Sequence, residues 1–235
     1  MNNEETAKSF SSLSTPLVAD ACLRLKVALR FAPPELKPLI QGTRVAGKAI
    51  PAMHFGSVDV FLEAMGEAEK GDVIVIDNGA RREEACIGDL TVLEAQASGL
   101  SGMVVNGYHR DTEELRRIGF PVFSLGSIPA GPRRLDKRTP DAMVRAGFGT
   151  FSVEGSDFVF GDDDGVVFVS STDVGAVLDV AQKIFKVERR QADSVRAGNK
   201  LRDQLRLKEY VEKRATDPAY TFRMHLRETG GAVEE

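Results

Sequence analysis

Three short apolar runs, separated by two stretches with helical spacing, constrain the fold of this chain more than any other feature. The apolar runs are DVIVID (72–77), GMVVN (102–106) and FPVFSLG (120–126), and the helical stretches are DLTVLEAQASG (89–99) and TEELRRIG (112–119). Short apolar strands that alternate with helices are typical of parallel sheets buried on both faces. The sequence therefore predicts an α/β fold with parallel crossovers, in which functional loops follow the carboxyl ends of the strands.

The amino-terminal segments show other patterns. The first residues form a polar lead, after which Ser14 or Thr15 is placed to cap a helix that has Pro16 at its first position. The segment TRVAGKAIPA (43–52) predicts a strand that is interrupted at Gly47.

Two further segments complete the α/β part of the chain. The stretch VDVFLEAMGEAEKG (58–71) predicts a helix that ends at Gly71, and residues 148–169 have the alternation and the Gly/Asp turns of antiparallel strands. The run Asp162–Gly165 lacks the ligand spacing and the closing Glu of an EF-hand, so it is interpreted as a turn rather than a calcium loop.

The chain beyond residue 173 predicts helix that becomes increasingly charged. Its apolar stripe thins after Val187, and Gly198 marks a break. We therefore predict a catalytic α/β domain over residues 1–182 and a helical extension over residues 183–235, which packs on a neighbouring subunit because it can bury little against its own. The stripe consists of Val174, Val177, Leu178, Ala181, Ile184 and Phe185.

Charge and composition exclude several classes of protein. The formal net charge is −4, so the positive excess between Lys183 and Arg214 is interpreted as a solvated helical face, and nucleic-acid binding is not expected. The two cysteines, Cys22 and Cys86, form no CxxC pair, and no eighteen apolar residues run together. The start of the chain has no basic-then-apolar signal pattern. We expect a soluble, cytoplasmic protein that does not bind membranes.

Two strand-to-helix corners, at residues 78–91 and 106–114, carry the residues best suited to chemistry. Parallel strands end at one edge of a sheet, so the two corners can face one crevice. The first corner supplies the backbone N–H groups of 88–91 at a helix start, which suit an anion. The second supplies Arg110, a forked donor for a carboxylate, and Asp111, a hard oxygen ligand for Mg²⁺ or Mn²⁺.

Ordinary helix capping is the alternative interpretation of these residues. Asp111 with Glu114 three residues later has the form of a capping box, Asp89 fits a simple N-cap, and Arg110 fits a surface cation. In the functional interpretation Asp89 instead holds a water that moves a proton. One carboxylate suffices for the metal, because Mg²⁺ commonly keeps several waters.

Four neighbouring residues have open roles. His109 fits a loop residue that lines the pocket better than a general base, because no orienting partner is visible. Arg81 and Arg82 either contact the second carboxylate of a dicarboxylic substrate or are exposed. Cys86 is expected to be a buried structural thiol.

The spacing of the charged residues carries a family resemblance. Asp89, twenty intervening residues, then Arg110 and Asp111 resemble the D-x20-R-D signature of class II pyruvate aldolases within the RraA-like superfamily. Those enzymes act on 4-hydroxy-4-methyl-2-oxoglutarate and 4-carboxy-4-hydroxy-2-oxoadipate. The similarity extends over most of the chain, through STPLVADAC, the central block from GDVIVID to NGYHRD, FPVFSLGSIPAG and GDDDGVVFV.

The resemblance implies a role for each site residue. It makes Asp111 the metal ligand, Arg110 the residue that binds substrate oxygens, and Asp89 the residue linked to the catalytic water. It also implies that a Glu from an adjacent subunit's C-terminal helix approaches the site, for which Glu188 is the candidate by position. The amides that would bind the pyruvate carboxylate belong to Gly88, Asp89, Leu90 and Thr91.

The implied function is that of a lyase dependent on Mg²⁺ or Mn²⁺. It would cleave a 4-hydroxy-2-oxo dicarboxylic acid to pyruvate and a second oxo acid, with oxaloacetate decarboxylation as a related activity. The implied fold is the RraA-like α/β type with a swivelling β/β/α arrangement, and the implied assembly is a homotrimer or homohexamer. Ribonuclease regulators on the same scaffold generally lack the Asp after Arg and the long C-terminal extension. A regulator that binds a ribonuclease or helicase, and an aldolase for a different hydroxy-oxo acid such as a sugar acid, are the alternatives.

Overall fold

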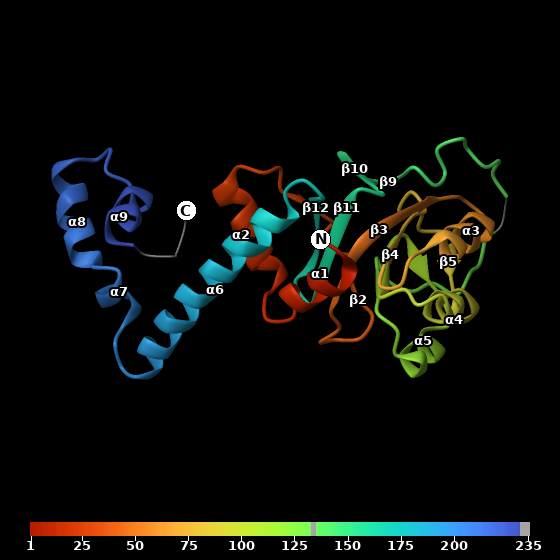
Figure 1. The fold of residues 1–235 in the computed structure, drawn as a ribbon, viewed down its shortest axis with the longest axis horizontal. Helices are drawn as coiled ribbons and strands as arrows, with labels where there is room; N and C mark the ends of the chain where they lie inside the picture. Colours follow the sequence, from red (N-terminus) through yellow and green to blue (C-terminus); the bar gives the residue numbers. More distant parts are fainter. Residues whose placement is uncertain (133–134, 231–235) are drawn as a thin grey trace. The chain divides into compact units, whose positions relative to one another are not determined.

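The computed structural model describes residues 1–132 and 135–230, and the chain forms two compact units (Figure 1). The first unit comprises Met1–Pro16 and Leu29–Gly175, and the second comprises Leu17–Ala28 and the chain from Ala176 onward. The first unit mixes sheet and helix, and the described part of the second is helical. The predicted fold class, an α/β fold followed by a C-terminal helical region, is confirmed.

The first unit contains the elements that were expected from the apolar runs. Its helices are α1 (Asn3–Phe10), α3 (Asp59–Glu67), α4 (Asp89–Ala97) and α5 (Thr112–Ile118). Its longer strands are β3 (Val45–Met53), β4 (Val73–Asp77), β6 (Gly102–Asn106), β11 (Asp157–Asp162) and β12 (Gly165–Ser170). Its shorter strands are β1 (Arg30–Phe31), β2 (Lys37–Pro38), β5 (Ala85–Ile87), β7 (Tyr108–His109), β8 (Val122–Ser124), β9 (Arg145–Phe148) and β10 (Phe151–Glu154).

One main sheet organises this unit, with the strand order β1-β12-β11-β3-β4-β6-β8-β2. The strands β3, β4, β6 and β8 are parallel, which confirms the crossovers predicted between the apolar runs. The strands β11 and β12 form an antiparallel hairpin, and β9 and β10 form a separate antiparallel pair. The prediction of antiparallel strands for residues 148–169 is therefore also confirmed.

The strand β3 joins the parallel and antiparallel parts of the sheet. Residues Val45–Lys48 pair antiparallel with β11, and Ala49–Met53 pair parallel with β4. The predicted interruption at Gly47 is wrong, because the strand is continuous there. A Cβ at Gly47 would collide with the carbonyl oxygen of Gly71, so glycine allows a close backbone approach within the strand.

Alternate residues of β4 enter two different apolar cores. Ile74 and Ile76 pack in a cluster with residues of α3, α4 and α5. Val73 and Val75 pack in a second cluster with aromatic side chains of β8, β9 and β12. Burial on both faces explains why this strand is apolar throughout, and it holds the carboxyl end of β4 rigidly at the edge where the first corner begins.

Two predicted helix boundaries are corrected. The polar lead is the helix α1, because Asn2 and Glu5 form a capping box and Phe10 is buried. The helix α3 ends at Glu67 rather than at Gly71, and the residues after it form a turn.

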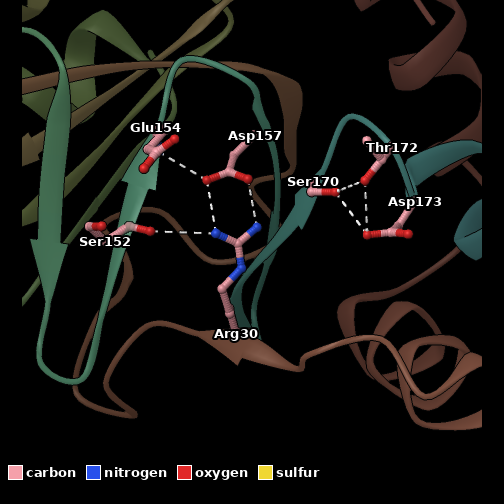
Figure 2. A network of polar contacts seen from close by, with 7 residues as sticks. All are labelled: Arg30, Ser152, Glu154, Asp157, Ser170, Thr172 and Asp173. Carbon is pink, nitrogen blue, oxygen red and sulfur yellow. Dashed lines mark hydrogen bonds and ion pairs between the residues drawn. The ribbon is translucent and has the colours of Figure 1, made fainter.

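Polar side chains of the first unit fix its turns and its edge strand. Asp162 accepts hydrogen bonds from the N–H and hydroxyl of Thr15 at 2.8 and 2.6 Å and from the Asp164 N–H at 3.0 Å, which supports the turn interpretation of this acidic run. Arg30, on the edge strand β1, donates from both terminal nitrogens to the Asp157 carboxylate at 2.9 and 2.6 Å (Figure 2). The N–H of Glu154 donates to the same carboxylate.

The second unit contains most of α2 (Thr15–Leu25) and α6 (Val174–Arg196), together with α7 (Leu201–Gln204), α8 (Leu207–Thr216) and α9 (Phe222–Thr229). The break predicted at Gly198 is confirmed, since α6 ends at Arg196 and Gly198 has a φ of +98°. His225, a residue of α9, is fully buried, with Nε2 2.8 Å from the Leu205 carbonyl oxygen. Among the helices of the described residues, none has the length and apolar character needed to cross a membrane.

Candidate active site

A small parallel sheet brings the two corners together. It pairs β5, which lies within the first corner, with β7, which lies within the second. The N–H of Arg110 continues this pairing by donating to the Ile87 carbonyl oxygen at 3.1 Å. The corners therefore lie side by side, as expected for loops that follow the parallel strands β4 and β6.

Asp89, Arg110 and Asp111 meet where these corners join. The Oδ2 atom of Asp111 lies 3.5 Å from Nε of Arg110 and accepts a hydrogen bond from the Asp89 N–H at 3.4 Å. The side chains of Arg110 and Asp111 are 49% and 37% exposed, so the pair stabilises the fold little and is open to a ligand. The structure brings the three residues together, and their catalytic roles stay predictions.

Neither aspartate makes the N-cap bond that the sequence suggested for it, Asp89 at α4 and Asp111 at α5. The N-cap of α4 is Gly88, whose N–H donates to Thr91 Oγ1 at 3.0 Å, and Asp89 is the first helical residue. Asp111 occupies the N-cap position of α5, but its side chain makes no capping bond and its backbone is left-handed, with φ +57° and ψ +38°. A left-handed residue other than glycine costs about 1 kcal/mol. This strained conformation holds the carboxylate beside Asp89 instead of over the helix.

The amides at the start of α4 already contact carboxylates. The Asp89 N–H donates to Asp111, and the Leu90 N–H donates to the Asp89 Oδ1 at 2.8 Å. The positive end of the helix dipole favours negative charge at the same place. A substrate carboxylate can use the Leu90 amide once the Asp89 side chain turns away from it.

A pocket of about 180 Å³ adjoins these residues. It is lined by residues 85–91 and Arg110, together with Val58 and Pro132. The side chain of Leu90 is 76% exposed at this pocket. All four residues expected to bind the pyruvate carboxylate, from Gly88 to Thr91, therefore line one cavity together with Arg110.

The segment that ends in Gly131 and Pro132 is the part of the site that the sequence pattern missed. The Ala85 N–H donates to the Ala130 carbonyl oxygen at 2.7 Å, which holds this segment against β5. A Cβ at Gly131 would lie 2.6 Å from Nη1 of Arg110. Glycine and proline in the sequence IPAGP indicate a turn, but nothing local shows that the turn packs on Arg110.

The donors present fit Mg²⁺ or Mn²⁺ as an ion shared with substrate. Among residues 1–132 and 135–230, no group of three or more His, Cys, Asp or Glu side chains is arranged to hold a metal ion. Asp111 has an exposed carboxylate whose protein contacts are one amide and one guanidinium. Because Mg²⁺ binds through one or two carboxylates and keeps several waters, Asp111 fits as its protein ligand.

Arg81 is bound to other side chains of the protein. Its Nη1 lies 3.2 Å from Glu84 Oε1 and its Nη2 lies 3.1 Å from Asp136 Oδ2. Its guanidinium also lies 4.3 Å from the centre of the Phe55 ring. These contacts favour a structural role for Arg81, whereas Arg82 is exposed and its role stays open.

His109 does not line the pocket beside Asp89, contrary to expectation. It is buried in β7, with Nδ1 2.7 Å from the Ser124 hydroxyl oxygen. Burial, assisted by the positive charge of Arg116, lowers the pKa of the His109 imidazole. A residue of a buried strand was mistaken for a loop residue because β7 has only two residues.

Comparison with known proteins identifies the family. The profile of RraA-like proteins (Aldolase/RraA) matches residues 15–168, well over half of the chain. This chain belongs to the RraA-like family. The matched region contains both corners and the pocket.

Two relatives carry the name "Putative 4-hydroxy-4-methyl-2-oxoglutarate aldolase". One, from Halalkalibacterium halodurans, is 30% identical over 181 residues, which cover 76% of this chain and 82% of that protein. The other, from Bacillus cereus, is 33% identical over 105 residues, which cover 45% of this chain and 65% of that protein. This RraA-like chain thus matches less than two thirds of the Bacillus cereus relative.

Solved structures of the family share the fold. Streptomyces coelicolor RraAS2, described as an unusual member of the RNase ES inhibitor RraA protein family, superposes with a TM-score of 0.69. It is 23% identical, and the superposition covers 84% of this chain and all of RraAS2. At this identity the similarity concerns the fold alone.

Glu188 lies in α6 of the second unit and is partly exposed. The expectation that it approaches the active site of an adjacent subunit concerns another copy of the chain, so it stays a prediction. The expected homotrimer or homohexamer stays a prediction for the same reason.

Replacing Gly131 with alanine is expected to lower kcat/KM for the pyruvate release expected from the sequence by about a hundredfold, because a misplacement of roughly 1 Å costs that much. The new methyl group would push the Arg110 guanidinium from its position. Steady-state kinetics measures the effect. The matched control is Gly66→Ala, at a helical glycine where the added Cβ meets nothing within 4 Å beyond its own helix backbone, and it should keep full activity. Equal activity of the two variants would show that the position of Arg110 does not matter.

Cys86 is expected to resist alkylation although it lines the pocket. Burial raises the pKa of its thiol to about 12, so at pH 8 almost none of it is the reactive thiolate. Mass spectrometry after iodoacetamide treatment should show no label on native protein, since Cys22 is also buried. Both cysteines should be labelled in guanidinium chloride, which serves as the control. Rapid labelling of native Cys86 would contradict the burial of its thiol.

Proposed function

We propose that this protein is a divalent-metal-dependent lyase that cleaves a 4-hydroxy-2-oxo dicarboxylic acid to pyruvate and a second oxo acid. The observation that carries the proposal is the position of Asp111. Its carboxylate makes no capping bond to α5, the helix that it precedes, and lies instead between the Arg110 guanidinium and the Asp89 amide at the start of α4. The names of the relatives from Halalkalibacterium halodurans and Bacillus cereus support the same class of substrate.

Each residue of the corner has a distinct task in this proposal. The amides of Leu90 and Thr91 bind the substrate carboxylate, and Arg110 donates to the 2-oxo oxygen as negative charge develops there. Asp111 would hold Mg²⁺ or Mn²⁺, which when bound supplies Lewis-acid polarisation of the 2-oxo group. Asp89 orients a water for proton transfer.

The proposed cleavage balances without an added redox partner. The water oriented by Asp89 takes the proton of the 4-hydroxyl group, the C3–C4 bond breaks, and C4 becomes the carbonyl carbon of the second oxo acid. The bonding pair passes to pyruvate as its enolate, whose charge Arg110 neutralises, and a proton returned to C3 gives pyruvate. In oxaloacetate the C3–C4 bond also breaks, which releases C4 as carbon dioxide and leaves the same enolate of pyruvate.

A Schiff-base mechanism is not part of the proposal, because no lysine occurs among the described residues that line the pocket. The test is pyruvate release, coupled to lactate dehydrogenase, from oxaloacetate and from 4-hydroxy-4-methyl-2-oxoglutarate. Each reaction is run with Mg²⁺, Mn²⁺ or EDTA, and blanks without protein correct for spontaneous decarboxylation. We expect turnover that requires metal and that survives borohydride treatment in the presence of substrate.

A second candidate function is a non-catalytic regulator, favoured by the fold shared with the RNase inhibitor family. No turnover of either substrate by the folded protein with either metal, together with tight capture of a ribonuclease or helicase, would support it. Turnover of a hydroxy-oxo sugar acid alone would instead keep the chemistry and change the substrate.

A further inference from the structure

A second pocket, of about 250 Å³, borders the same backbone segment as the active site. It is lined by Glu35, residues 37–39, His109, Thr112, Arg116 and residues 124–127. His109 immediately precedes Arg110, and Thr112 immediately follows Asp111. The two pockets therefore lie along one short segment of chain. Arg110 lines the first pocket, and the residues on either side of the Arg110–Asp111 turn, His109 and Thr112, line the second.

Arg116 supplies this pocket with a positive charge. The adjacent Arg117 forms ion pairs with both Glu113 and Glu114, so the acidic residues at the start of α5 pair with Arg117 rather than with Arg116. Within the described parts of the chain, Arg116 makes no ion pair or hydrogen bond through its side chain. A guanidinium at a cavity that has no ion pair or hydrogen bond of its own can bind an oxyanion.

The other polar side chains that line this pocket limit the charge and the hydrogen-bonding groups of an anion that can bind there. Lys37 adds a second positive charge, and its ammonium group is fixed by a 2.8 Å hydrogen bond to the Asp164 carbonyl oxygen. Glu35 adds one negative charge, so the ionised Lys, Arg and Glu side chains of the lining sum to one positive charge. The hydroxyl groups of Thr112 and Ser127 can donate to a bound anion.

We propose that this pocket binds a small monoanionic hydroxy acid. Its carboxylate pairs with Arg116 and accepts hydrogen bonds from the hydroxyl groups, and its own hydroxyl donates to Glu35. A dicarboxylic acid would place a second negative charge near Glu35, so the ligand differs in class from the substrate of the proposed lyase. A ligand bound here contacts the residues on either side of Arg110 and Asp111, so its binding can be coupled to the position of these two side chains. The pocket is therefore a candidate regulatory site.

Isothermal titration calorimetry of the full chain in EDTA tests the proposal, with glycerate as the probe. We expect saturable binding to the wild type. Arg116→Gln should weaken it by about tenfold or more, the loss expected for one charge-assisted hydrogen bond. The matched control, Arg117→Gln, changes the neighbouring arginine and should bind as the wild type does. Absence of saturable binding, or equal binding by both variants, would overturn the proposal.

Three further titrations test the ligand class and the location of the site. Acetate lacks the hydroxyl group and should bind more weakly than glycerate, and inorganic phosphate should not bind more tightly than glycerate. The opposite order in either comparison would contradict the assigned ligand class. Arg110→Lys alters the active site and should leave glycerate binding unchanged, whereas loss of binding would place glycerate there instead. None of these measurements needs turnover, so their outcome is independent of the lyase proposal.

Discussion

Replacing Asp111 with asparagine is expected to lower kcat/KM for metal-dependent pyruvate release by about a thousandfold or more. The change removes the charge that would hold the metal, whose Lewis-acid contribution is several kcal/mol. Asparagine is chosen because it tolerates the left-handed backbone found at this position and has nearly the same size. The lactate-dehydrogenase assay measures the loss, and the melting temperature should be unchanged because the side chain is exposed.

The matched control for this prediction is Glu113→Gln. Glu113 is an exposed carboxylate two residues further on, bonded to Arg117 rather than to the corner. Its replacement should leave kcat/KM unchanged at every metal concentration. If Asp111→Asn kept wild-type activity that EDTA abolishes, the metal would be held by other residues and the assignment of Asp111 would be wrong.

Replacing Arg30 with methionine is expected to lower the free energy of unfolding by about 3 kcal/mol, the usual loss when one partner of a buried ion pair is removed. The side chain of Asp157 is 4% exposed. Without Arg30 its buried negative charge would be stabilised mainly by the hydrogen bond from the Glu154 N–H (Figure 2). Because Arg30 lies on the edge strand β1, the pairing of β1 with β12 should weaken as well. Urea unfolding followed by circular dichroism measures the change.

Two comparisons isolate the cost of the unpaired carboxylate. Arg145→Met breaks an exposed pair with Asp141 and should cost less than about 1 kcal/mol. The double variant Arg30→Met with Asp157→Leu should recover part of the loss, because no buried charge is left unpaired. A double variant less stable than Arg30→Met alone would show that the bond from Glu154 to Asp157, rather than the ion pair, holds this edge.

The parallel core was predictable because its signal is local. Each apolar run lies between turn residues, and burial on both faces of β4 and β6 leaves no polar position in the middle of either strand. The convergence of Asp89 with Arg110 and Asp111 followed from the same topology, since parallel strands end at one edge. The antiparallel hairpin of β11 and β12 was likewise visible in its alternation and its acidic turn.

What could not be predicted depends on contacts between distant residues or on a single backbone angle. The packing of Gly131 on Arg110 is set by a hydrogen bond from Ala85, which has no signature in the sequence. The pattern of Asp111 and Glu114 fits a capping box, and only the left-handed conformation of Asp111 shows that its carboxylate is turned elsewhere. Gly47 looked like an interruption because the carbonyl it accommodates belongs to Gly71, far along the chain.

The most direct test of the proposed chemistry at this corner is exchange of the pyruvate methyl protons in D₂O, followed by proton NMR. This reaction reports formation of the enolate at the corner of Asp89, Arg110 and Asp111, and it does so without knowledge of the second oxo acid. We predict exchange that requires Mg²⁺ or Mn²⁺ and is lost in Asp111→Asn. Exchange that continues in EDTA, or no exchange by folded wild-type protein with either metal, would contradict it.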